Sequence, residues 1–161
     1  MTITTERVVA TAAHDTKGLI SPDLFARLVA RIVRDEQVSV EHAERVMVQT
    51  LGFLRACALN PEARLSPSEA VDVGWHTFIL HTREYAAFCQ QVAGRFIHHR
   101  PTSEQDVCDG KASCKSEAIG ATVAAMRAAG ISVDTELWNP AANCSQCHAG
   151  CHDSPQPEDA A

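Results

Sequence analysis

Apolar residues recur at helical spacing through the first sixty residues of the chain. Ser21-Pro22-Asp23 offers an N-cap, a proline at the first helical position and an acidic residue for the positive end of the helix dipole. The stripe that follows predicts a helix over about 22–35, whose inward residues are Leu24, Phe25, Leu28, Val29, Ile32 and Val33. A second stripe predicts a helix from Ser39 to about Leu59, which Asn60-Pro61 would end.

Segment 66–81 combines an explicit helix start with a body that is almost entirely apolar. Ser66-Pro67-Ser68-Glu69 has the form of a capping box with proline at the first helical position. The residues after it are apolar on nearly every face, which is typical of a helix enclosed by other helices. Asp72 and His76 are the polar exceptions. Because they lie one turn apart on one face, the carboxylate can reach an imidazole nitrogen.

The following residues predict a shorter helix and then a reversal of the chain. Thr82 caps the fourth predicted helix, Gly94 stops it, and its inward residues are Tyr85, Phe88, Cys89 and Val92. Pro101 favours extended geometry just before it, so His98 and His99 lie on a turn that can fold back over segment 66–81. One more helix is predicted over about 116–129. Without β-alternation, the fold class is all-α, a small domain of about four to five helices with a Cys/His-rich, mostly irregular C-terminal segment.

Length and charge divide the chain and narrow its partners. The 161 residues suit one ordinary domain, and no apolar run approaches the ~20 residues that span a bilayer. The first 13 residues lack the pattern of a secretory signal, so a cytoplasmic location is expected. Residues 101–161 hold 3 basic and 9 acidic residues and carry the whole net charge of -6. With no basic stripe, nucleic acids and membranes are poor partners, and a metal cation is favoured.

Cysteine follows the same division and predicts a metal-binding segment. Cys144-Ser-Gln-Cys147-His148-Ala-Gly-Cys151-His152 places five potential ligands in nine residues, and Cys108 and Cys114 can supply a further ligand. A two-residue spacer lets both thiolates of Cys144 and Cys147 reach one ion, and interleaved Cys and His favour zinc. Copper, or iron in an iron–sulfur cluster, is the alternative, and so is an incidental tail that binds nothing. We therefore expect a helical domain over 1–102, an acidic metal-binding segment with one helix over 103–153, and a disordered tail over 154–161.

A resemblance covers about thirty residues around Trp75. Asp72-x-x-Trp75-His76-Thr77-x-x-Leu80, followed by Tyr85, Phe88-Cys89, Gly94 and His99, resembles the core segment of the glycine-rich domain-containing protein-like family. Phe78 stands where that family usually carries a second histidine, a role that His81 or His98 could take over. The resemblance implies a helical domain and no particular reaction.

The same residues form a second candidate site. His76 is the candidate metal ligand or acid/base group, Asp72 would orient it, and His98 or His99 would converge on it, as in carboxylate–histidine–metal arrangements. The competing interpretation is a structural hydrogen bond between a buried Asp72 and His76, since an unpaired buried polar group costs several kcal/mol.

Three functions remain open at this point. The leading hypothesis is a structural zinc ion held by the C-terminal cluster, with the helical domain as a binding or interaction module for a protein partner. The first alternative is a metalloenzyme that uses His76 and His98/His99 together with Cys or His from the C-terminal segment on an unidentified small-molecule substrate. The second is a metal-handling protein for zinc or copper. Nucleotide-binding loops and a serine-hydrolase elbow are absent from the sequence.

Overall fold

The structure, a computed structural model, describes residues 16–99 and 112–139, and the regular secondary structure in these two ranges is helical. After a 3-10 turn, η1 (Lys17–Leu19), come the helices α1 (Pro22–Glu36), α2 (Val40–Leu59), α3 (Glu69–Ile79), α4 (Thr82–Ala93), α5 (Ala112–Ala128) and α6 (Thr135–Trp138). No strand occurs in these two ranges, which confirms the all-α fold class. The described part contains six helices instead of four to five. The C-terminal Cys/His-rich segment and the tail lie outside the described residues.

Serine caps explain where three of the helices begin. The side chains of Ser21, Ser39 and Ser68 each accept a hydrogen bond from a main-chain N–H three residues further on. The third cap differs from the expectation, because α3 begins at Glu69 and Ser66 precedes the helix. Ser66 instead pairs with α5: its N–H donates to Thr122 Oγ1 at 2.9 Å, and the Thr122 hydroxyl donates to its carbonyl at 2.9 Å.

Two other helix starts also differ from the sequence expectation. At α4 the N-cap position is His81, which makes no side-chain cap hydrogen bond, and Thr82 is the first helical residue. Helix α5 begins at Ala112, four residues earlier than expected. Both are shifts of a helix end, where local sequence signals are weakest.

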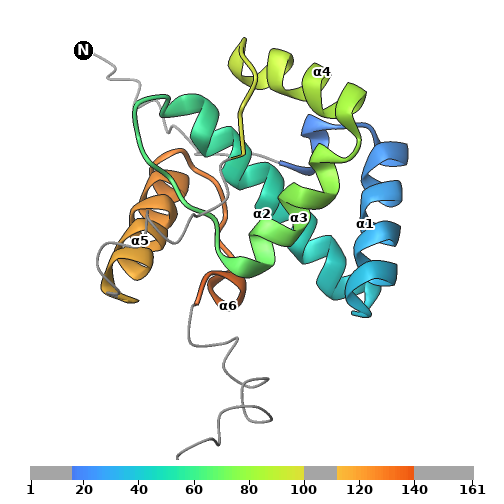
Figure 1. Ribbon diagram of the computed structural model, residues 1–161, viewed down its shortest axis with the longest axis horizontal. Coiled ribbons are helices and arrows are strands. Elements are labelled where there is room, and N and C mark those ends of the chain that lie inside the picture. Colours follow the sequence, from blue (N-terminus) through green and yellow to red (C-terminus); the bar gives the residue numbers. More distant parts are fainter. Residues whose placement is uncertain (1–15, 100–111, 140–161) are drawn as a thin grey trace, which may run out of the picture.

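Helix α2 runs through the middle of the molecule, with α1 on one side and α5 on the other (Figure 1). It contacts α1, α3, α4 and α5, and α3 also contacts α1, α4 and α6. The two helices α2 and α3 approach closely at Gly74, where an added Cβ would lie 2.1 Å from Thr50 Oγ1. Glycine at this position therefore lets α3 lie directly against α2.

Helices α5 and α6 share the core of the preceding helices. Ile119, Met126, Ile131, Leu137 and Trp138 are all buried in one apolar cluster with residues of α1 to α4. An added Cβ at Gly52 of α2 would lie 2.9 Å from Ile131 Cγ2, so this contact is tight as well. The expected domain boundary at residue 102 falls outside the described residues. In the described part, no helix is long and apolar enough to cross a membrane.

Candidate metal site at Asp72, His76 and His99

Asp72, His76 and His99 bring one carboxylate and two imidazoles together at the surface. His99 Nε2 lies 2.9 Å from Asp72 Oδ1, and His76 Nε2 lies 3.8 Å from Asp72 Oδ2. The two imidazole rings are 4.4 Å apart between centroids. One ligand atom from each of the three residues lies within 4.8 Å of those of the other two. We refer to these three residues as the Asp72 cluster.

Local helix geometry and a chain reversal build the cluster. Asp72 and His76 lie one turn apart on α3, as their spacing predicts. Helix α4 ends at Gly94, whose φ of 63° lies in the left-handed region that glycine adopts without strain. The chain after α4 then returns toward α2 and α3, which brings His99 to Asp72 (Figure 1). This return is the turn that the sequence analysis expects after Gly94.

Exposure increases across the cluster from His99 to His76. The side chains of His99, Asp72 and His76 are 12%, 33% and 58% exposed, respectively. The expectation of an enclosed helix is therefore wrong for this face of α3, which reaches solvent at His76. The closer partner of Asp72 is also His99, 27 residues away, and not the neighbouring His76.

The spacing of the cluster is compatible with a small metal ion. Zinc bonds to nitrogen and oxygen are about 2.0–2.1 Å long, so neighbouring ligand atoms of a tetrahedral site lie about 3.3 Å apart. The 2.9 and 3.8 Å separations in the cluster are of similar size, although they end on the two different oxygens of Asp72. Carboxylate oxygen and imidazole nitrogen are both ligands that zinc accepts. The arrangement can hold a metal with three protein ligands and leave a position open on the solvent side.

Comparison with known proteins places the chain in a family. Residues 17–116, which include the Asp72 cluster and helices α1 to α4, match the family described as UCP032817-like. The chain belongs to the UCP032817-like family. No curated protein matches it, and no solved structure does.

This match corrects the resemblance to the glycine-rich domain-containing protein-like family, which was wrong. The physical reason lies in the residues that carried it. Trp75, Tyr85, Phe88 and Cys89 of this UCP032817-like protein are buried core residues of the α3–α4 pair. Their types and spacing are set by helix packing, and helix pairs of unrelated families can share such spacing.

The remaining predicted residues of the UCP032817-like chain are not in the cluster or lie outside the described residues. His98 is exposed, with its ring 4.9 Å from that of Phe96, and His81 is at the N-cap of α4. Cys114 falls in α5, but its side chain lies outside the described part. The same holds for the C-terminal residues and for Cys108, so zinc binding by Cys144, Cys147, His148, Cys151 and His152 stays a prediction.

Two cysteines of the described part are free thiols on the helical domain. Cys89 is buried, and Cys57 is half-buried against the core. Burial raises the pKa of Cys57 to about 12, which keeps the group a neutral thiol at ordinary pH. A thiol that stays protonated is a poor nucleophile and a poor metal ligand, so Cys57 acts as a small apolar group, and Cys89 does so because it is fully buried in the core.

The buried hydrogen bonds next to the cluster could not be predicted from the sequence. The indole N–H of Trp75 donates to the Tyr85 hydroxyl at 2.8 Å, and that hydroxyl donates to the Ile97 carbonyl at 2.7 Å. The one available signal was that a buried tryptophan or tyrosine needs a polar partner. The partner itself is a main-chain carbonyl, which no sequence pattern identifies.

Proposed function

We propose that this UCP032817-like protein binds a divalent transition metal, zinc above all, through Asp72, His76 and His99. One observation carries the proposal: three side chains of ligand type, from two separate segments, meet with their ligand atoms within 4.8 Å of one another. A carboxylate shared between two imidazoles is an arrangement that a cation stabilises, because it replaces weak contacts by three coordinate bonds.

The competing interpretation is a structural Asp72–His99 hydrogen bond. That bond would satisfy the half-buried Asp72 and the mostly buried His99 without any help from His76. Helix spacing accounts for the 3.8 Å between His76 Nε2 and the carboxylate, but not for the approach of the His76 ring to that of His99, which comes from a separate segment. The position of His76 therefore favours the metal site.

The open side of the cluster favours an exchangeable or reactive metal over a buried structural one. Structural zinc sites use four protein ligands, whereas catalytic sites use three and keep water at the fourth position. His76 is more than half exposed, which leaves room for that water. Two histidines and one carboxylate are also the ligand set of non-haem iron(II) sites, so iron is the second candidate metal.

Metal titration of the full chain tests this proposal. The cysteines outside residues 16–99 could bind zinc by themselves, so the titration uses a full-length variant in which serine replaces Cys108, Cys114, Cys144, Cys147 and Cys151. We call it the thiolate-free variant, because the two cysteines that remain, Cys57 and Cys89, pack in or against the core. We expect one equivalent of zinc to remain bound in this thiolate-free variant, as measured by calorimetry. Adding His76→Ala or Asp72→Asn should weaken that binding at least tenfold, because each removes one of three ligands.

His98→Ala is the matched control, since it removes a neighbouring exposed histidine that is not in the cluster. It should leave zinc affinity unchanged. Zinc binding that is insensitive to His76→Ala and Asp72→Asn, or no binding at all in the thiolate-free variant, would rule out the Asp72 cluster as a metal site. The same titration with iron(II) under argon identifies the preferred metal.

A further inference from the structure

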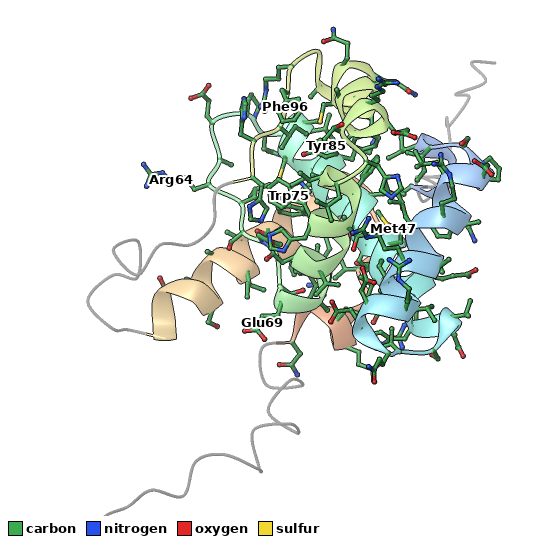
Figure 2. All side chains as sticks on the ribbon, turned by 45° about the vertical axis from the view of Figure 1, so that its right-hand side comes forward. Met47, Arg64, Glu69, Trp75, Tyr85 and Phe96 are labelled. Atoms are coloured by element: carbon green, nitrogen blue, oxygen red, sulfur yellow. The ribbon has the colours of Figure 1, made fainter. Side chains whose placement is uncertain are left out.

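Tyr85 is the middle residue of a buried series of hydrogen bonds that ends at the carbonyl of Ile97, two residues before His99. Its hydroxyl accepts from Trp75 Nε1 and donates to the carbonyl of Ile97, and the side chain of Tyr85 is fully buried. Figure 2 shows Trp75 and Tyr85 in the interior, where α3 meets the segment after α4. Burial raises the pKa of Tyr85, so the group remains a neutral hydroxyl that can donate.

Aromatic contacts hold both Tyr85 and Trp75 in place. The ring centroid of Tyr85 lies 5.2 Å from that of Phe78 and 5.2 Å from that of Phe96, and both pairs are in edge-to-face contact. The ring of Trp75 contacts Phe53 at 5.2 Å and His99 at 4.5 Å. Trp75 thus touches the cluster directly and also anchors the tyrosine that binds the His99 segment.

Residues 96–99 alternate between exposed and buried positions. Phe96 and His98 are exposed, Ile97 is buried, and His99 is half-buried. In an extended segment, residues two apart point to the same side. A bond that fixes the carbonyl of Ile97 therefore also fixes which of the two adjacent histidines faces Asp72. A slip by one residue would turn His99 outward and His98 inward.

We infer that Tyr85 and Trp75 are positioning residues that select His99, and not the adjacent His98, as the third ligand of the Asp72 cluster. This inference rests on the proposed metal site. It also explains why His98, with the same chemistry one residue away, stays outside the cluster. Groups that orient a metal ligand in this way typically change metal affinity 10–100-fold when they are removed.

The test uses Tyr85→Phe, which keeps the ring and removes the hydroxyl. In the thiolate-free full-length variant, we expect Tyr85→Phe to weaken zinc binding about tenfold. With Tyr85 present, His98→Ala should have no effect on zinc affinity. In the Tyr85→Phe background, His98→Ala should weaken binding further, because the segment can then present either histidine. This dependence on His98 is a readout that a general loss of stability would not produce.

Thr122→Val is the matched control, because Thr122 also carries a fully buried hydroxyl with several hydrogen bonds, but on α5. It should lower stability without changing zinc affinity or creating a dependence on His98. The inference would be overturned if a folded Tyr85→Phe variant kept its zinc affinity and if adding His98→Ala to it left that affinity unchanged. If Tyr85→Phe does not fold, the same measurements on Trp75→Phe, which removes the donor to Tyr85, decide in the same way.

A metal-free measurement separates this inference from the proposed function. The rings of Trp75 and His99 are in edge-to-face contact, with their centroids 4.5 Å apart, so we expect the indole to shift the NMR signals of the His99 ring protons. We expect Tyr85→Phe to abolish most of that shift in the absence of metal, whereas Thr122→Val should retain it. Loss of the shift in a protein that binds no zinc would support the positioning role and reject the metal site. A Tyr85→Phe variant that keeps the shift, in a protein that does bind zinc, would support the metal site and reject the positioning role.

Discussion

The two tryptophans of this chain both contact Phe53, but their polar surroundings differ. Phe53 contacts the ring of Trp75 at 5.2 Å and that of Trp138 at 6.2 Å, and both indoles are almost fully buried. The Trp138 indole donates to Gln49 Oε1 at 2.8 Å. The Trp75 indole donates to Tyr85, whose bond leads to the segment that carries His99.

The polar network at Trp138 is closed. Gln49 Oε1 also accepts from the N–H of Asp134, and Gln49 Nε2 donates to the carbonyl of Ser132. Arg45 forms two hydrogen bonds with the carboxylate of Asp134 and another with Glu136. Each buried group here has a protein partner, which is what a purely structural network requires.

The network at Trp75 ends in a cluster that is open to solvent. Asp72 faces two imidazoles at unequal distances, and His76 is more than half exposed. A network that is closed contributes to folding, whereas one that ends in exposed ligand atoms can bind something further. The difference between the two sides makes the Asp72 cluster, and not the Arg45 network, the candidate site.

The largest expected loss of stability concerns the closed network at Trp138. Gln49→Leu should lower the free energy of unfolding by about 3 kcal/mol, because it leaves the Trp138 N–H, the Asp134 N–H and the Ser132 carbonyl without their partner. Urea unfolding measures the loss. Asp72→Asn is the comparison on the open side, where about 0.5 kcal/mol is expected without metal. Equal losses in the two variants would mean that the two networks do not differ in kind.

The next largest loss of stability tests how tightly α3, which carries Asp72 and His76, is held against α2. Gly74→Ala should cost about 2 kcal/mol, since its Cβ would meet Thr50 Oγ1, which is itself bonded to the carbonyls of Val46 and Val71. Gly120→Ala on α5 meets nothing within 4 Å and should stabilise the protein by about 0.5 kcal/mol through helix propensity. Thermal unfolding of both variants checks the contrast. A stable Gly74→Ala variant would show that α3 can move away from α2.

Local signals account for what could be predicted from the sequence. Serine caps and apolar stripes predicted α1 and α2 to within a residue or two, and an apolar stripe with the Gly94 stop predicted α4. The four-residue spacing predicted that Asp72 and His76 would share a face. His99 could be proposed as their partner because Gly94 before it and Pro101 after it indicated a reversal of the chain.

Tertiary contacts account for what could not be predicted. Ser66 looked like a helix cap but binds Thr122, which is 56 residues away. The closed network at Trp138 joins α2 to residues more than 80 positions later, and its short helix α6 has no apolar stripe of its own. The family resemblance was wrong for a related reason, since much of the pattern behind it consists of packing residues of one helix pair.

A smaller loss of stability is expected at low pH, and it arises from Asp134 in the closed network at Trp138. Hydrogen bonds from Arg45 hold the pKa of Asp134 below its usual value, so the folded state favours the ionised form more than the unfolded state does. Asp134 therefore contributes stability above about pH 4, and this contribution is lost as pH falls through the lowered pKa. We expect a loss of about 1 kcal/mol or less, since Asp134 and Arg45 are partly exposed. Asp134→Asn should remove this part of the pH dependence when urea unfolding is compared at pH 7 and pH 3.

The smallest effect, His76→Ala without metal, is the sharpest test of the comparison. His76 is exposed and lies 3.8 Å from its only charged partner in the cluster, so its removal should change stability by less than about 0.5 kcal/mol. Zinc should then stabilise the thiolate-free protein by about 2.7 kcal/mol at a hundred times its Kd, but stabilise its His76→Ala variant much less. A residue that contributes nothing to folding, yet controls the response to zinc, would be a ligand. If zinc stabilises both proteins equally, the cluster is only a hydrogen-bonded surface pair, and the open side has no more function than the closed one.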